Sequence, residues 1–364
     1  MKIAPIQRVM TATNWCEPIL VHTGQHYDEA MSKIFFEDLE MPHPDYFLGV
    51  GSGTHAQQTA AIMVKLEEIV QRISPELILV VGDVNSTLAA SIVAAKLQIP
   101  IAHVEAGLRS FDRHMPEEIN RILTDAVSDY LFITEESGKI NLLKEGVDPQ
   151  KIHFVGNVMI DSLFHCEAKA DRSKILDQLN LDHTPFALLT LHRPSNVDFR
   201  QTFVEIIDAL DDIQRRIQII FPIHPRTRKM IDQFGLSGRL QTMRNFRLID
   251  PLGYLEFLKL MKNASFVLTD SGGIQEETTA LSIPCLTLRE NTERPSTVKV
   301  GTNILVGMNS ELIRRHSFDI INGEAKTGTI PPLWDGKAAL RIVSVLKEHM
   351  SPSKEKLMGQ FDGR

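Results

Sequence analysis

The chain has 364 residues, of which 43% are hydrophobic, and this length predicts two domains because it exceeds one typical core. Its 39 basic and 46 acidic residues give a net charge of −7, which argues against a general nucleic-acid surface and against binding to an anionic membrane. The three scattered cysteines, Cys16, Cys166 and Cys285, imply neither a disulfide framework nor a zinc site, and they fit a reducing cytoplasm. The sequence contains no apolar run of membrane-spanning length and no signal-peptide pattern.

Strand-like and helix-like runs alternate in the first half of the chain, which is the pattern of a parallel α/β layer. The glycine-rich run 49–53 is similar to a dinucleotide-binding fingerprint, but its third glycine is misplaced and no acidic residue follows at the expected distance, so it is predicted to be a loop. Strands are predicted at 19–22, 77–81, 101–104, 130–134 and 152–155, and helices at 28–36, 54–73, 86–97, 117–127 and 136–143.

A second alternating set follows, with strands predicted at 186–190, 217–220, 264–269 and 285–288, and helices at 203–212, 255–261, after Ser271 and at 336–349. The sequence therefore predicts an α/β fold of two Rossmann-like, doubly wound parallel-sheet domains that face each other across a cleft. We expect one domain in residues 1–160 and one in 161–335, with a closing helix and tail (336–364) packed on the first domain. In such sheets ligands bind outside the carboxyl ends of the strands.

The strand predicted at 264–269 runs directly into Ser271-Gly272-Gly273 and then into a helix. A free helix N-terminus with flanking glycines suits a phosphate. The carboxylate of Glu277, one turn into this helix, could take a pair of ribose hydroxyls, and Arg294 on the next loop could be a second anion ligand. An ordinary strand–turn–helix with a well-capped start explains the same residues.

Four polar residues occur where predicted strands stop or helices start, namely Asp83, Glu105, Glu117 and His192. Each also has a structural explanation: Asp83 as a helix cap, Glu105 as the ion-pair partner of Arg109, Glu117 as a complement to a helix dipole, and His192 as a satisfied core histidine. Together, three carboxylates and a histidine opposite an anion-binding helix predict proton transfer at a carbon next to a phosphorylated centre. The sequence alone thus indicates a nucleotide-sugar or phosphate-ester enzyme that needs no cofactor.

Eight stretches along the chain belong together as a set. They are TGQHYDEAM (23–31), GDVNST (82–87), HVEAGLRS (103–110), MPEEINR (115–121), GNVMIDSL (156–163), LHRPSNVD (191–198), TDSGGIQEE (269–277) and TERP (292–295). Through these stretches, which occur in family order, the chain resembles the non-hydrolysing UDP-N-acetylglucosamine 2-epimerases over essentially its whole length. The resemblance implies a glycosyltransferase-B-like fold in a cytoplasmic homodimer of polysaccharide biosynthesis. It also implies conversion of UDP-N-acetylglucosamine to UDP-N-acetylmannosamine by elimination and re-addition of UDP through a 2-acetamidoglucal, without cofactor or metal.

The resemblance also implies roles for individual residues. Those matched to proton transfer and to the diphosphate-side histidine are Asp83, Glu105, Glu117 and His192. Those matched to substrate binding are Lys2, Arg109 and Arg193, the uracil-side Leu252 and Phe257, the diphosphate loop Ser271, Gly272 and Gly273, the ribose ligand Glu277, and Arg294. Those near a second, activating UDP-sugar site are Gln25 and His224.

The start of the chain departs from the family pattern. Family members begin with a β-strand and a GTRPE-type loop, and the chain as written starts with the segment that follows this loop. The resemblance therefore predicts that a central strand and a substrate-binding arginine are absent and that these 364 residues are poorly active. Four other functions remain open: a 2-epimerase of a modified UDP-sugar such as a diacetamido-uronic acid, a glycosyltransferase of the same fold, a non-catalytic nucleotide-sugar sensor, and a hydrolysing 2-epimerase.

Overall fold

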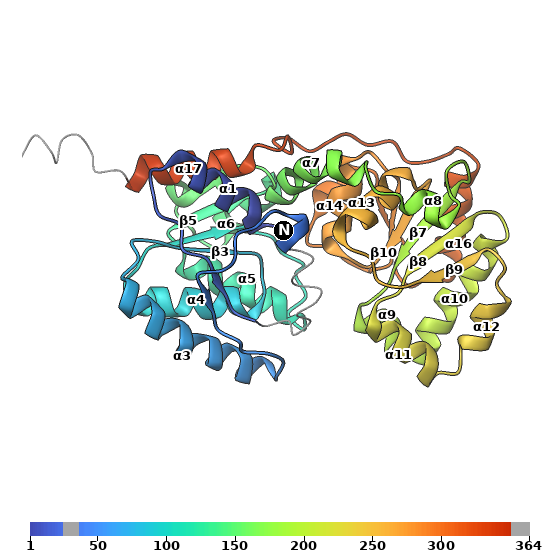
Figure 1. Ribbon diagram of the computed structural model, residues 1–364, viewed down its shortest axis with the longest axis horizontal. Helices are drawn as coiled ribbons and strands as arrows, with labels where there is room; N and C mark the ends of the chain where they lie inside the picture. The colour runs from blue at the N-terminus through green and yellow to red at the C-terminus, as the bar shows by residue number, and fades with distance from the viewer. Residues whose placement is uncertain (25–35, 351–364) are drawn as a thin grey trace, which may run out of the picture.

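The computed structural model describes residues 1–24 and 36–350, which form two parallel sheets, each with helices on both faces (Figure 1). All strand pairs in both sheets are parallel, as the alternating pattern predicts. The first sheet has the order β3 (Ile78–Val81), β4 (Ile101–Val104), β5 (Tyr130–Ile133), β6 (Ile152–Phe154). The second has the order β12 (Asn303–Leu305), β11 (Cys285–Thr287), β10 (Phe266–Thr269), β7 (Phe186–Thr190), β8 (Gln218–Pro222), β9 (Phe246–Ile249).

The strand order of the second sheet creates a switch point between β7 and β10. The chain moves outward from β7 to β9 and then returns to the other side of β7 with β10, β11 and β12. Loops that leave neighbouring strands in opposite directions open a crevice at the carboxyl edge of the sheet. The loops at this point carry His192 and the turn Ser271-Gly272-Gly273.

A separate pair of short parallel strands, β1 (Val21–His22) and β2 (Tyr46–Phe47), lies beside the first sheet. Within the residues that the structure describes, this pair forms no ladder with β3. The prediction that a central strand is absent here stays a prediction.

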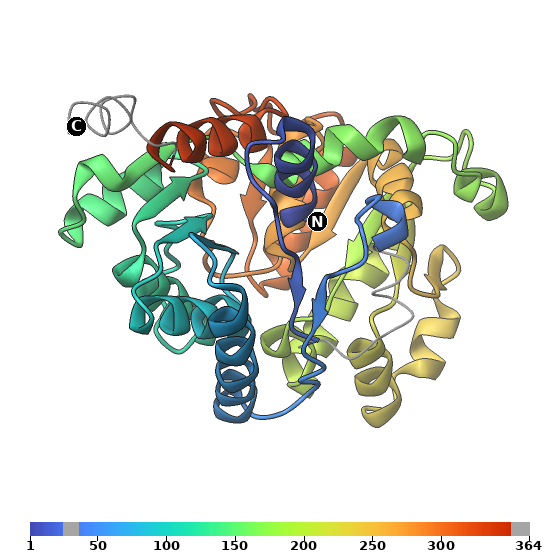
Figure 2. The ribbon, with the colours of Figure 1, turned by 60° about the vertical axis from the view of Figure 1, so that its left-hand side comes forward.

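The helices of the first unit cover both faces of its sheet. The helix α3 (His55–Ile73) buries the stripe Ile62, Leu66 and Val70, and a capping box between Thr54 and Gln57 fixes its start. With α3 on this face are α4 (Asn85–Lys96) and α5 (Pro116–Val127), and α6 (Glu136–Lys144) follows β5. The opposite face is covered by α1 (Ile3–Thr13) and α17 (Ala338–Met350), which lie side by side (Figure 2).

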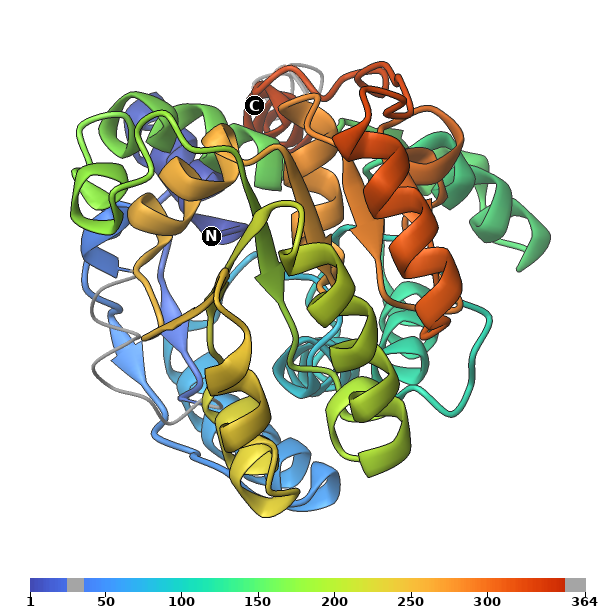
Figure 3. The ribbon, with the colours of Figure 1, turned by 90° about the vertical axis from the view of Figure 1, so that its right-hand side faces the viewer.

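The second sheet is likewise enclosed between two helical layers (Figure 3). One layer contains α7 (Val158–Ala170), α8 (Ile175–Leu179), α13 (Tyr254–Asn263) and α14 (Gly272–Ala280). The other contains α10 (Arg200–Gln214), α11 (Pro225–Gln233), α12 (Ser237–Thr242) and α16 (Ser310–Ile321), and the short α9 (Pro194–Val197) and α15 (Pro295–Lys299) follow β7 and β11.

In the described part of the chain, the backbone passes from the first unit to the second around Gly156 and returns around Trp334. Trp334 is buried and its Nε1 donates to the carbonyl of Thr134 at 2.9 Å. After this crossing, α17 packs in one core with Ile6, Phe132 and Val104 of the first unit. None of the helices in the described part of the chain is long and apolar enough to cross a membrane.

Candidate active site

The carboxyl ends of both sheets open into one cavity of about 180 Å³. It brings together six of the predicted site residues, which come from two units far apart in the sequence. It also brings in Met115, Arg121 and Glu293, to which the sequence analysis gave no role. Its lining is Asp83, Val84, Met115, Glu117 and Arg121 from the first unit, and Arg193, Gly272, Gly273, Glu293 and Arg294 from the second.

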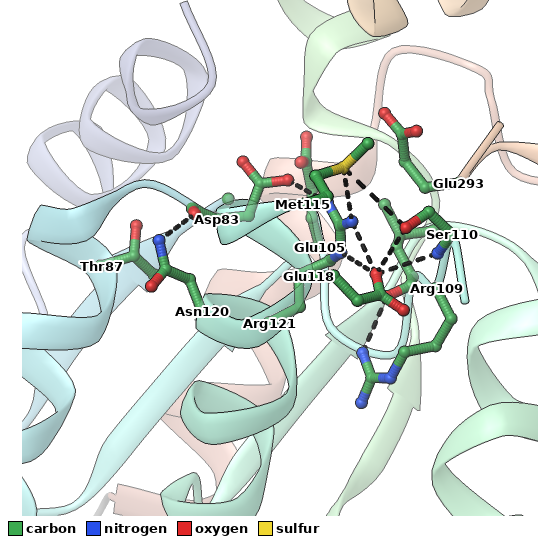
Figure 4. Close-up of polar contacts among 12 residues, drawn as sticks. Asp83, Thr87, Glu105, Arg109, Ser110, Met115, Glu118, Asn120, Arg121 and Glu293 are labelled. Atoms are coloured by element: carbon green, nitrogen blue, oxygen red, sulfur yellow. Dashed lines mark hydrogen bonds and ion pairs between the residues drawn. The ribbon is translucent and has the colours of Figure 1, made fainter. Parts of the chain in front are cut away.

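Asp83 follows β3 at a turn made by Gly82, whose φ of 74° suits glycine. Its carboxylate is paired with the guanidinium of Arg121, and its carbonyl accepts a hydrogen bond from Asn120 Nδ2 at 2.9 Å (Figure 4). The helix α4 starts after Val84 without a side-chain cap. The interpretation of Asp83 as a helix cap is therefore wrong, because its carboxylate is held by a cation at the cavity wall.

Arg121 forms ion pairs with two carboxylates, those of Asp83 and Glu118. Its Nε and Nη2 donate to Glu118 Oε2 at 3.0 and 2.7 Å, while Nη1 contacts Asp83. Glu118 in turn accepts the backbone N–H groups of Ser110 and Phe111, both at 2.9 Å. Burial alone would raise the pKa of Glu118, but the bonds from Ser110 and Arg121 lower it. A charged Glu118 thus fixes Arg121, which orients Asp83.

Glu105 follows β4 in a left-handed conformation with φ of 73°, which is strained for a residue other than glycine. Its carboxylate is buried, with Oε2 2.5 Å from Lys2 Nζ and 4.0 Å from Arg294 Nη2. Within residues 1–24 and 36–350, Glu105 Oε1 has no hydrogen-bond partner. Strain and an unpaired buried oxygen are typical of a functional position.

Arg109 has a different position from the one predicted. Its Nη2 lies 2.7 Å from Asp125 Oδ2 and 2.6 Å from Glu145 Oε2, so the alternative in which Arg109 pairs with Glu105 is wrong. The chain turns at Gly107, where an added Cβ would lie 2.5 Å from a backbone oxygen, and the N–H of Gly107 donates to Asp125 at 3.0 Å. This turn sends Arg109 beneath the loop, outside the cavity lining, where it braces the segment that carries Glu105.

The turn Ser271-Gly272-Gly273 places the N-terminus of α14 at the cavity. Ser271 is at the N-cap position, but its side chain makes no capping hydrogen bond, and its own N–H donates to Thr269 Oγ1 at 3.0 Å. The first N–H groups of a helix have no partner within the helix, so this turn offers donors and a positive dipole end to an anion. A Cβ added at Gly272 would lie 2.7 Å from Arg294 Nη1, so glycine lets the arginine lie against the turn.

Two arginines add positive charge at the same place. Arg294 is buried, and burial would lower its pKa, but Glu276 and Glu293 outweigh this effect and raise it. Arg193 also lines the cavity. Its pKa is lowered mainly by burial and in second place by the nearby Arg289. The second unit thus brings Arg193, Arg294 and Glu293 to the cavity, and the first unit brings Asp83, Glu117 and Arg121.

His192 is held by Asp270, a buried residue to which the sequence analysis gave no role. Asp270 Oδ1 lies 2.7 Å from His192 Nδ1, and Oδ2 accepts the N–H groups of His192 and Arg193, each at 2.8 Å. Burial would raise the pKa of Asp270, but contact with His192 lowers it. An aspartate placed immediately after a buried strand was the only sequence signal for this role.

The remaining predicted residues are not part of the cavity lining, and one of them lies outside the described part of the chain. Leu252 and Phe257 are half-buried at the start of α13, and Glu277 is buried on α14. The ring of His224 is 5.7 Å from that of His192, and Gln25 lies outside the described residues.

Comparison with known proteins gives a consistent result. The family profile described as UDP-N-acetylglucosamine 2-epimerase matches residues 8–347. The UDP-N-acetylglucosamine 2-epimerase of Methanocaldococcus jannaschii is 46% identical over 352 residues, covering 95% of this chain and 95% of that protein. Its structure in complex with UDP-GlcNAc and UDP has a TM-score of 0.88 at 45% identity, covering 95% of this chain and 96% of that chain.

Two further likenesses bear on substrate and fold. The UDP-2,3-diacetamido-2,3-dideoxy-D-glucuronate 2-epimerase of Pseudomonas aeruginosa is 43% identical over 317 residues, which are 86% of each chain. A lipopolysaccharide outer core galactosyltransferase is only 13% identical, with a TM-score of 0.51 over 91% of this chain and 99% of that one, and it shares the fold alone. The predicted glycosyltransferase-B-like fold is confirmed.

Proposed function

Because the chain belongs to the UDP-N-acetylglucosamine 2-epimerase family, we propose that it inverts C2 of UDP-N-acetylglucosamine to give UDP-N-acetylmannosamine. The observation that carries this proposal is the cavity that Asp83 and Glu117 share with Arg193, Arg294 and the N-terminus of α14. The carboxylates suit transfer of the C2 proton, and the arginines and the helix N-terminus suit the diphosphate.

In the proposed reaction a carboxylate removes the proton at C2 while the C1–O bond breaks and its electrons leave with UDP. The resulting 2-acetamidoglucal then receives a proton at C2 on the opposite face, and UDP adds again at C1. Asp83, Glu105 and Glu117 are the proposed proton-transfer residues. Glu105 is suited to this role because its Oε1 lacks a hydrogen-bond partner among the described residues.

The second unit is proposed to stabilise the charge that develops on the departing UDP. Arg193 and Arg294 carry fixed positive charge at the cavity, and His192, oriented by Asp270, adds a hydrogen-bond donor. The proposed ligands of the rest of the nucleotide are Ser271, Gly272 and Gly273 for the diphosphate, Glu277 for ribose, Leu252 and Phe257 for uracil, and Lys2 as the partner of Glu105.

This division of labour corresponds to the proposed domains. Residues 1–160 would supply the carboxylates and residues 161–335 would bind UDP, with the segment from 336 returning to the first domain. Closure of the two units would exclude water and keep UDP in place for re-addition.

The test is proton NMR of UDP-N-acetylglucosamine with this protein in D₂O, at high enzyme concentration so that slow turnover is recorded. We expect UDP-N-acetylmannosamine with deuterium at C2. Release of free N-acetylmannosamine with UDP would assign the hydrolysing reaction instead. Conversion without deuterium at C2 would contradict the proton-transfer mechanism.

A second candidate substrate is a UDP-diacetamido-uronic acid, because the Pseudomonas aeruginosa enzyme with that name is 43% identical to this chain. A sugar carboxylate would require a further cation near C5. The same NMR experiment with this sugar decides between the two substrates, and turnover of the uronic acid alone would reassign the function.

The proposal also includes a cytoplasmic homodimer and activation by the UDP-sugar at a second position near His224. The support for the latter is that the ring of His224 lies 5.7 Å from that of His192, so a ligand there would contact the diphosphate side of the site. Sedimentation tests the dimer, and a sigmoidal dependence of rate on UDP-N-acetylglucosamine tests the activation.

A further inference from the structure

Tyr254 connects the two parts of the proposed nucleotide site. It is the first residue of α13, between Leu252 and Phe257, which are proposed to hold the base. The residue is only 5% exposed, and its hydroxyl donates to Glu277 Oε1 at 2.8 Å. Its backbone N–H donates to Asp38 Oδ2 at 3.1 Å, so the residue is fixed at both ends.

Glu277 needs such a partner because its position is unfavourable for a charge. It is 3% exposed on α14, and burial raises the pKa of its carboxyl to about 7, while the hydrogen bond from Tyr254 lowers it. The nearby Glu276 raises the pKa of Glu277 further, whereas the N-terminal amine of Met1 lowers it. Tyr254 thus favours the ionised carboxylate, which is the form that accepts two hydrogen bonds from a diol.

We propose that Tyr254 is a positioning residue that orients the Glu277 carboxylate toward the ribose of the uridine nucleotide, so that selection of ribose over 2′-deoxyribose depends on the tyrosine hydroxyl. This inference rests on the proposed function for the role of Glu277. The hydroxyl occupies one position on Oε1, which fixes the plane of the carboxylate. Oε2 and the second acceptor position of Oε1 then remain for the ribose hydroxyls, and a sugar without the 2′-hydroxyl leaves one of them unpaired.

The test compares UDP-N-acetylglucosamine with its 2′-deoxyuridine analogue in the wild type and in Tyr254→Phe, which removes one oxygen and keeps the ring. The wild type is expected to prefer the ribonucleotide by at least about 10-fold in kcat/KM, because a buried acceptor is left unpaired by the deoxy sugar. In Tyr254→Phe the preference for the ribonucleotide falls to within about 3-fold, because KM for the ribonucleotide rises. The kcat of this variant changes by less than about 2-fold.

The pH dependence gives a second readout that a purely structural role would not change. KM of the wild type should rise as the pH falls below about 7, where Glu277 becomes protonated. In the variant this rise should begin about one pH unit higher, because the charged form has lost a hydrogen bond.

A double-mutant cycle combines Tyr254→Phe with Glu277→Gln, in which the side-chain amide does not titrate. Tyr254→Phe should then raise KM much less in the Glu277→Gln background than in the wild type. Tyr130→Phe, which removes a hydroxyl at the start of β5 in the other unit, is the matched control and should leave the ribose preference unchanged.

The inference would be overturned if Tyr254→Phe left the ribose preference or the pH dependence of KM unchanged. It would also be overturned if Tyr254→Phe raised KM equally in the wild type and in Glu277→Gln, or if the variant did not fold. Titration calorimetry with UDP and 2′-deoxy-UDP measures the same preference without turnover. If the wild type binds UDP but converts no UDP-sugar, the proposed function fails while the inference about Tyr254 is still decided by the binding ratio.

Discussion

Asp270 is a buried acid that acts through another residue, because its contacts to His192 and Arg193 fix the loop after β7. In Asp270→Asn the neutral amide keeps the shape but loses the charge beside His192 Nδ1. We expect kcat to fall on the order of 100-fold with little change in KM, since the orientation of His192 changes while the phosphate ligands remain. Steady-state kinetics measure this effect.

Asp198→Asn is the matched control, because Asp198 ends the short helix after His192 and pairs with Arg226 on α11. It should reduce kcat by less than about 3-fold. A similar loss in both variants would mean that the loop, and not His192, limits the reaction.

Glu276 is fully buried next to Arg294, and burial raises the pKa of Glu276 to about 7 from its ordinary value of 4.5. Between these two pH values the folded protein holds a proton at Glu276 that the unfolded chain has released. The free energy of unfolding therefore falls as the pH rises from 4.5 to about 7. Glu276→Gln should remove this slope and gain about 2 kcal/mol relative to the wild type between pH 5 and pH 8.

Urea unfolding of the ligand-free protein at several pH values checks this prediction. Glu68→Gln on the exposed side of α3 is the control and should follow the wild type at every pH. Parallel curves for the wild type and Glu276→Gln would show that Glu276 stays ionised when buried.

The sequence identified chemistry at single residues but not their partners. Asp83 and His192 were found because polar residues at the ends of apolar strands are recognisable locally. Their partners, Arg121 and Asp270, lie 38 and 78 residues away, and only the folded chain brings them together. The pairing of Arg109 with Glu105 failed for the same reason, since the turn at Gly107 separates two residues that are close in sequence.

At the scale of elements, the N-terminus of α14 depends on the absence of a side chain at Gly272. In Gly272→Ala the new Cβ would meet Arg294 Nη1 at 2.7 Å and Glu293 Oε1 at 2.8 Å, so Arg294 must move away from the turn. We expect KM to rise about 10-fold or more, because the displaced Arg294 binds the phosphate less well. A 10-fold rise corresponds to a loss of about 1.4 kcal/mol of binding free energy. Kinetics and UDP titration measure the loss.

Gly238→Ala in α12 is the matched substitution, because no atom lies within 4 Å of a Cβ built there. It should leave KM unchanged and increase stability slightly, since alanine is the better helix former. An unchanged KM in Gly272→Ala would place the phosphate away from this turn.

Elements with a strong local pattern were predicted and weak ones were not. The long helix α3 and the strands β4 and β7 follow from apolar periodicity and apolar runs, whereas β12 has only three residues and gives no such signal. The helix α16 was missed although Asn309 accepts the N–H groups of Glu311 and Leu312, which is a capping signal visible in the sequence. The strand β9 was also missed. It is stabilised by pairing with β8, and pairing between distant segments cannot be predicted from the sequence of one of them.

At the scale of the whole molecule, the core of the first unit includes residues from the end of the described chain. Leu346 of α17 is fully buried against β4 and β5, so Leu346→Ala should cost about 2–4 kcal/mol. Hydrogen exchange should then accelerate in β4 and β5 before it does in β7 and β10. Ile313→Ala, which is buried on α16 against the second sheet, should show the reverse order. Equal acceleration in both sheets would show that the two units unfold together.

The position of α17 has a consequence for how the protein is made. A ribosome releases β4, β5 and α1 early, but the apolar face that they share stays uncovered until residues 338–346 have left the exit tunnel. By then the second sheet, with helices on both of its faces, has already been synthesised and can fold. We therefore expect the first unit, although it is synthesised first, to complete its core after the second unit. The first unit should also depend more on chaperones than the second.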